Sequence, residues 1–130
     1  MDVILDTCGL LSLIGVAERK LSKNTLDIIQ YAEHVYISSC SLFEIATKHK
    51  KEKLNISPFK NSFSLWQTIV SDYQMTELSV SAEIFYNSTT LEGHHNDPFD
   101  RIIISEAIDK KATVVTYDSL FSSYGVQIIN

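Results

Sequence analysis

Short runs of apolar residues alternate along the chain with longer segments in which apolar residues recur at helical spacing. The short runs are rich in Val and Ile and are bounded by polar residues, a pattern typical of buried strands. We therefore predict strands at residues 3–5, 35–37, 76–80, 113–116 and 126–129.

The longer segments carry apolar residues three or four positions apart, as at Leu26 and Ile29, which is the period of an amphipathic helix. The hydroxyl-rich segment 38–41 offers caps for the helix that follows it. Pro98 suits the first position of a later helix. Helices are predicted at residues 7–14, 23–34, 42–51, 59–72, 81–91 and 98–110.

Fully apolar strands that alternate with helices predict an α/β fold, in which a parallel sheet is covered on both faces. The sequence contains no repeat and no linker-like stretch, so we expect a single domain over residues 1–130. A chain of this length buries about two-thirds of the surface that its unfolded form exposes. In such sheets the functional site lies outside the carboxyl ends of the strands. Residues that end a strand or begin the next helix are therefore the first candidates.

Composition narrows the class of protein. A hydrophobic fraction of 45%, with 21% charged residues, predicts a folded soluble protein and excludes extended disorder. No apolar run reaches the roughly 18 residues of a membrane helix, and the N-terminus lacks the pattern of a signal peptide. Two cysteines do not make a disulfide framework. We therefore expect a cytoplasmic protein in which Cys8 and Cys40 are buried, reduced thiols.

The net charge of −5 places a condition on any nucleic-acid partner, because an acidic chain is repelled by phosphates. A chain of this kind needs bound metal ions or a local basic patch to act on nucleic acid. A basic patch exists at residues 47–53, where four lysines and one histidine are concentrated.

Four acidic residues occupy the positions at which function is expected. Asp6 follows the first strand, and Glu44 lies in the first turn of the helix after the second strand. Asp100 lies in the first turn of the helix that Pro98 opens, and Asp118 lies just beyond the strand at 113–116. Each acid by itself is explained by the preference of acids for helix N-termini and turns.

The apolar residues that follow Asp100 favour a functional role for this acid. Asp100 precedes Ile103 and Ile104 by three and four positions, so it shares their inward-facing stripe. Carboxylates that converge in a low dielectric repel one another, and a divalent cation with oxygen ligands relieves that repulsion. We therefore predict an acidic site for Mg²⁺ or Mn²⁺ that includes Asp6 and Asp100.

Four segments resemble a known family in order and spacing: VILDTCGLLSLI, SSCSLFEIATKHKKEKL, HHNDPFDRIIISEA and ATVVTYDSLFSSYGV. On these segments the chain resembles PIN-domain ribonucleases, and among them VapC-type toxins of type II toxin–antitoxin pairs. The stretch from about residue 56 to 90 carries no motif. The chain also departs from the family at Phe43, where Trp is frequent, and at Glu52, where Gly is frequent.

The resemblance implies a PIN-like three-layer α/β/α fold with a short central parallel sheet. It implies a metal-dependent endoribonuclease that hydrolyses RNA phosphodiester bonds with Mg²⁺ or Mn²⁺. It also implies a cognate antitoxin and a homodimer. The residues that match the family's catalytic and metal-binding acids are Asp6, Glu44, Asp100 and Asp118, with Asp97 as a further candidate ligand.

Three residues are predicted to bind substrate. Lys48 lies four positions after Glu44 on the same helix face, which suits either a phosphate contact or an ion pair with Glu44. Arg101, beside Asp100, suits a phosphate contact or neutralisation of the acids. Thr116 matches a recurrent hydroxyl of the family.

His94 and His95 are expected to be loop residues rather than metal ligands, because hard cations prefer oxygen.

Two other functions remain open on the sequence alone. One is a catalytically silent PIN-like module that binds protein or RNA. The other, less favoured, is a phosphatase or phosphoacceptor domain that uses Asp6 covalently. Such domains require further features, such as a second Asp two positions later, where this chain has Cys8.

Overall fold

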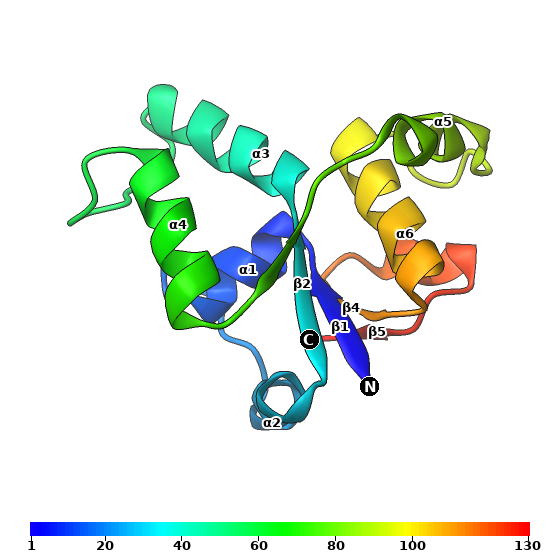
Figure 1. Ribbon diagram of the computed structural model, residues 1–130, viewed down its shortest axis with the longest axis horizontal. Coiled ribbons are helices and arrows are strands. Elements are labelled where there is room, and N and C mark those ends of the chain that lie inside the picture. Colours follow the sequence, from blue (N-terminus) through cyan, green and yellow to red (C-terminus); the bar gives the residue numbers. More distant parts are fainter.

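A five-stranded parallel sheet forms the centre of the molecule (Figure 1), with strand order β3-β2-β1-β4-β5. The computed structural model describes residues 1–130. Every neighbouring pair of strands is parallel, so all strands end at the same edge. The strands are β1 (Asp2–Leu5), β2 (His34–Ser38), β3 (Thr76–Leu78), β4 (Thr113–Val115) and β5 (Ile128–Ile129).

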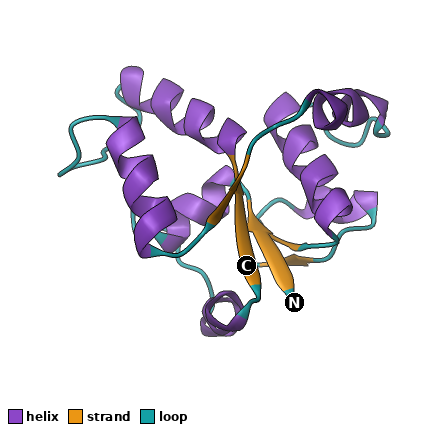
Figure 2. Cartoon of the chain, viewed as in Figure 1, coloured by secondary structure: helices purple, strands orange, loops and turns teal.

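Helices cover both faces of this sheet, as Figure 2 shows. They are α1 (Thr7–Leu13), α2 (Lys23–Tyr31), α3 (Ser39–Lys50), α4 (Ser62–Asp72), α5 (Ala82–Thr90) and α6 (Pro98–Lys110), and a 3₁₀ segment η1 spans Ser119–Tyr124. The predicted α/β fold with three layers is confirmed. No helix is long and apolar enough to cross a membrane.

The alternation of side chains along β1 divides the core in two. Val3 and Leu5 pack with residues of α1 and α4 on one face. Ile4, which points the other way, packs with α6 and η1. Strand residues point alternately to the two faces, so a fully apolar strand is the expected partner of two helical layers.

Side-chain caps decide where several helices begin, and here some predicted boundaries were wrong. Ser38 Oγ accepts a hydrogen bond from Cys40 N, so α3 begins at Ser39 rather than at Leu42. As a result, Glu44 lies in the second turn of α3, not the first. Asn61 caps α4 in the same way, which starts that helix three residues later than predicted.

Glu106 is a buried carboxylate on α6, in the layer that packs against β2. It is 3% exposed, and its Oε1 has no hydrogen-bond partner. Burial raises the pKa of Glu106 to about 7, against the opposing effect of the Ser38 hydroxyl. Asp109 adds to the rise and Lys110 opposes it. Folding therefore favours the protonated form of this side chain.

We expect Glu106→Gln to change the pH dependence of stability. The pKa of Glu106 rises from 4.5 to about 7 on folding, so its stabilising protonation is complete below pH 4.5 and is lost as the pH rises to 7. The neutral amide does not titrate. As the pH rises from 4.5 to 8, the free energy of unfolding of the variant should therefore increase by roughly 3 kcal/mol relative to that of wild type. Urea unfolding at a series of pH values measures this difference. Exposed Glu18→Gln is the control, and parallel pH curves for Glu106→Gln and wild type would contradict the expectation.

Candidate functional site

Four acidic side chains from distant segments line one cavity at the carboxyl edge of the sheet. The cavity has a volume of about 680 Å³. Asp6 reaches it from the end of β1 and Glu44 from α3. Asp100 comes from α6, and Asp118 follows β4. The fold thus brings together all four acids that the sequence singled out, and Asp97 lines the same cavity.

Both carboxylate oxygens of Asp6 accept hydrogen bonds. Its Oδ1 caps α1 by accepting from Gly9 N at 2.7 Å, and its Oδ2 accepts from the Thr116 hydroxyl at 2.5 Å. The residue is only 5% exposed. Burial raises the pKa of Asp6, and the Asp118 carboxylate adds to the rise, while Thr116 and Gly9 oppose it. A nearby cation would therefore favour the ionised form that burial disfavours.

Glu44 is oriented by the hydroxyl group of Thr7, the first residue of α1. The Thr7 hydroxyl donates to Glu44 Oε1 at 2.6 Å, and the Ser41 hydroxyl lies 2.9 Å from Thr7 Oγ1. Burial raises the pKa of Glu44, as it does for Asp6. The hydrogen bond between Thr7 and Glu44 links α1 to α3, so it fixes one wall of the cavity.

His95 joins two of the acids, which the sequence did not predict. Its Nε2 lies 2.7 Å from Asp118 Oδ2 and 3.0 Å from Asp100 Oδ2. Its Nδ1 accepts from Asp97 N at 3.1 Å, so the ring proton lies on Nε2 and faces the two carboxylates. The residue is in a loop, as expected, but it is buried and belongs to the site.

Asp100 and Asp97 differ in their environment. Burial raises the pKa of Asp100 to about 7; the Asp97 carboxylate adds to the rise and His95 opposes it. Asp97 caps α6 by accepting from Phe99 N at 2.8 Å and from Asp100 N at 3.3 Å. Its cap role is therefore clear, whereas a role as metal ligand stays a prediction.

The three predicted substrate-binding residues have different surroundings. Lys48 lines the cavity and opposes the pKa rise of Glu44 through its charge, without a direct ion pair to that carboxylate. Thr116 is fully buried, and its hydroxyl holds Asp6. This burial leaves Thr116 a positioning role in place of the substrate contact that the sequence suggested.

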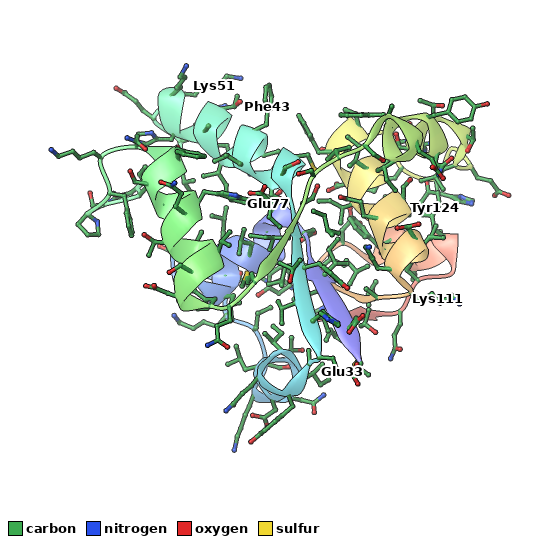
Figure 3. All side chains as sticks on the ribbon, in the orientation of Figure 1. Glu33, Phe43, Lys51, Glu77, Lys111 and Tyr124 are labelled. Atoms are coloured by element: carbon green, nitrogen blue, oxygen red, sulfur yellow. The ribbon has the colours of Figure 1, made fainter.

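Arg101 also forms its hydrogen bonds within the protein. Its guanidinium donates to backbone carbonyls of the segment between α5 and α6, at Leu91, Glu92 and His95. It also donates to the carbonyl of Ser88. Tyr124, which Figure 3 shows beside α6, donates to the same Glu92 carbonyl. These bonds use four of the five N–H donors of Arg101 and fasten the loop that carries His95. The phosphate contact and the neutralisation of the acids stay predictions.

The two thiols have different environments, and the expectation that both are buried was wrong. Cys40 is buried, and burial raises its pKa to about 12. Cys8 is exposed at the cavity rim because it lies in the first turn of α1, beside Asp6. Partial desolvation and then the Asp6 carboxylate raise the pKa of Cys8, which disfavours the thiolate that a nucleophile requires.

A family comparison agrees with this geometry. The sequence model of the PIN domain family matches residues 3–127 of this chain. The chain belongs to the PIN domain family. No match was found among curated proteins.

Solved structures similar to this PIN domain include VapBC toxin–antitoxin proteins. VapBC2 from Rickettsia felis, bound to a promoter DNA fragment, has a TM-score of 0.72 at 21% identity, covering 100% of this chain and 98% of that one. DNA-bound VapBC from Salmonella typhimurium gives 0.69 at 18% identity, covering 98% and 96%. VapC20 of Mycobacterium tuberculosis, a sarcin–ricin loop cleaving toxin, gives 0.67 at 15% identity, covering 95% of each chain. At these identities the likeness establishes the fold.

The donor atoms of the cavity suit a hard divalent cation. The cavity acids offer carboxylate oxygens, the ligands that Mg²⁺ and Mn²⁺ prefer. Carboxylate oxygens of Asp100 and Asp118 lie within 4.8 Å of each other. Burial raises the pKa values of Asp6, Glu44 and Asp100, and neighbouring carboxylates add to each rise, so a bound cation would stabilise their ionised forms. The residues present therefore fit such an ion.

Proposed function

We propose that this PIN domain is a metal-dependent endoribonuclease that acts in the cytoplasm as the toxin of a toxin–antitoxin pair. The observation that carries the proposal is the convergence of four acids, from segments far apart in sequence, on one cavity at the carboxyl edge of the sheet. Membership of the PIN family and the likeness to VapC toxins support it.

Asp6, Asp100 and Asp118 are proposed to hold Mg²⁺ or Mn²⁺, with Glu44 binding directly or through water. An ion of this kind supplies an activated water and stabilises charge on the phosphate that is attacked. Thr116 and Gly9 fix both oxygens of Asp6, so that carboxylate keeps one orientation. Lys48 offers a positive charge to the RNA backbone at the rim of the same cavity.

We propose that His95 holds two of the acids close together before an ion binds. Its Nε2–H bridges Asp100 and Asp118, which would otherwise repel each other across a half-buried site. Arg101 fixes the loop that carries His95. Neither residue needs to touch RNA in this account.

The partners proposed for this chain are suggested by the solved structures that it resembles. Solved relatives are VapBC proteins, in which a toxin is bound to its antitoxin. We propose that a cognate antitoxin neutralises this chain, that the chain forms a homodimer, and that residues 1–130 act as one domain. A covalent role for Asp6 stays the less favoured alternative, because phosphoacceptor domains have a second Asp two positions later, where this chain has Cys8.

We expect the purified protein to cleave single-stranded RNA only when Mg²⁺ or Mn²⁺ is present. Chelation with EDTA should remove the activity, and excess Mn²⁺ should restore it, as followed by mapping of new RNA ends. Mn²⁺ should also raise the melting temperature, because it relieves repulsion among the acids. Ca²⁺ is a useful comparison, since it can bind without supporting cleavage. RNA that stays intact in all metals, with no metal-induced rise in melting temperature, would favour the catalytically silent module instead.

A further inference from the structure

A second cation stands at the rim of the acidic cavity, and the proposed mechanism does not use it. Arg19, in the loop between α1 and α2, lines the cavity with the acids. Its guanidinium lies over the ring of Tyr117, with Cζ 3.7 Å from the ring centroid. The side chain is exposed and forms no ion pair or hydrogen bond within the protein. Its donors are therefore free to bind an anion.

Tyr117 makes a fixed platform for this arginine. Its hydroxyl donates to Ser12 Oγ on α1 at 3.1 Å, and its half-buried ring packs against the core between the sheet and α1. A cation–π contact favours the flat orientation of the guanidinium over the ring. Arginine held in this way loses less conformational entropy when it binds a phosphate than a free side chain does.

The strand order places Lys48 and Tyr117, the residue that Arg19 contacts, after the two strands that flank β1. Lys48 lies on α3, which follows β2, whereas Tyr117 follows β4. β1, which ends at Asp6, lies between β2 and β4. RNA carries a phosphate at every nucleotide, so a backbone that crosses the acids presents flanking phosphates on both sides of the one at the centre.

We propose that Arg19, held against the ring of Tyr117, binds an RNA phosphate next to the phosphodiester that is cleaved. This phosphate would lie on the side of the acidic centre opposite Lys48. A guanidinium can engage two phosphate oxygens at once, which favours arginine over lysine here. The assignment rests on the proposed nuclease function and specifies how its substrate is held. The sequence did not single out Arg19, because its place at the cavity depends on the turn after α1.

The test measures RNA binding without cleavage. In an Asp100→Asn background, which is expected to be inactive, labelled single-stranded RNA is titrated at several salt concentrations. Arg19→Ala should weaken binding about fivefold and reduce the slope of log Kd against log salt by about 0.7, the value for one phosphate contact on a single strand. Tyr117→Leu, which keeps the charge, should weaken binding while leaving the slope nearly unchanged. In the active protein, Arg19→Ala should raise KM with little effect on kcat.

Lys23→Ala, at the exposed start of α2, is the matched control for loss of one positive charge. Unfolding by urea should show equal stability for Arg19→Ala and Lys23→Ala, which separates binding from folding. The proposal is overturned if the two variants have the same Kd and the same salt slope. If wild type cleaves RNA and Arg19→Ala is unaffected, only the role of Arg19 is lost. If the protein neither binds nor cleaves RNA, the nuclease proposal is lost with it.

Discussion

Asp100→Asn is expected to reduce RNA cleavage by about 1,000-fold or more while the protein stays folded. Asn keeps the shape of the side chain but removes the charge, and Asp100 is one of the acids proposed to hold the metal ion. Loss of several kcal/mol of transition-state stabilisation corresponds to a rate loss of this size. Cleavage of a labelled RNA under single-turnover conditions measures the effect.

The same substitution should increase stability when no metal is present. Burial and the Asp97 carboxylate raise the pKa of Asp100 to about 7, so its ionised form destabilises the fold at higher pH. Asp100→Asn removes that cost, and the rise in melting temperature on adding Mn²⁺ should shrink. Asp27→Asn, exposed on α2 and outside the acidic cavity, is the control and should change neither property. Full cleavage by Asp100→Asn would remove this residue from the proposed site.

The layered fold was accessible from the sequence because β1, β2 and β4 are apolar on both faces. A strand such as Val3–Leu5 must bury both sets of side chains, and helices on either side are the only partners that a chain of this length offers. The residues at which the helices begin were harder to predict from the sequence. Ser38 and Ser41 are both plausible caps in the sequence, and only backbone geometry selects Ser38.

The acids of the site could be predicted for a different reason: each one follows a strand or lies in the first or second turn of a helix. Strand ends meet at one edge of a parallel sheet, so local position in sequence implies proximity in space. His95 and Arg101 were not accessible in this way. The partners of Arg101 are backbone carbonyls at the end of α5 and in the loop that follows it, and no pattern of side chains in the sequence indicates them. The burial of Thr116 likewise follows from its place between Asp6 and Asp118.

Gly9→Ala is expected to destabilise the protein by roughly 2–4 kcal/mol, opposite to the usual effect of this change in a helix. Alanine normally stabilises a helix by about 1 kcal/mol relative to glycine. In α1, however, a Cβ on residue 9 would lie 2.4 Å from the carbonyl oxygen of Val115 and 3.1 Å from Asp6 Oδ1. The first of these atoms is backbone in the central sheet, which cannot move without disturbing β4, and overlap of this kind costs several kcal/mol.

The overlap would also reach the acidic site. Asp6 N donates to the same Val115 oxygen at 3.2 Å, and Gly9 N donates to the Asp6 carboxylate at 2.7 Å. Moving α1 away from β4 would therefore shift Asp6, so we expect metal binding to weaken along with stability, as measured by urea unfolding and by Mn²⁺ titration. Gly93→Ala is the control, because a Cβ there meets no atom within 4 Å. Equal stability of the two alanine variants would show that α1 can shift away from β4 at little cost, and that the close approach at Gly9 does not fix Asp6.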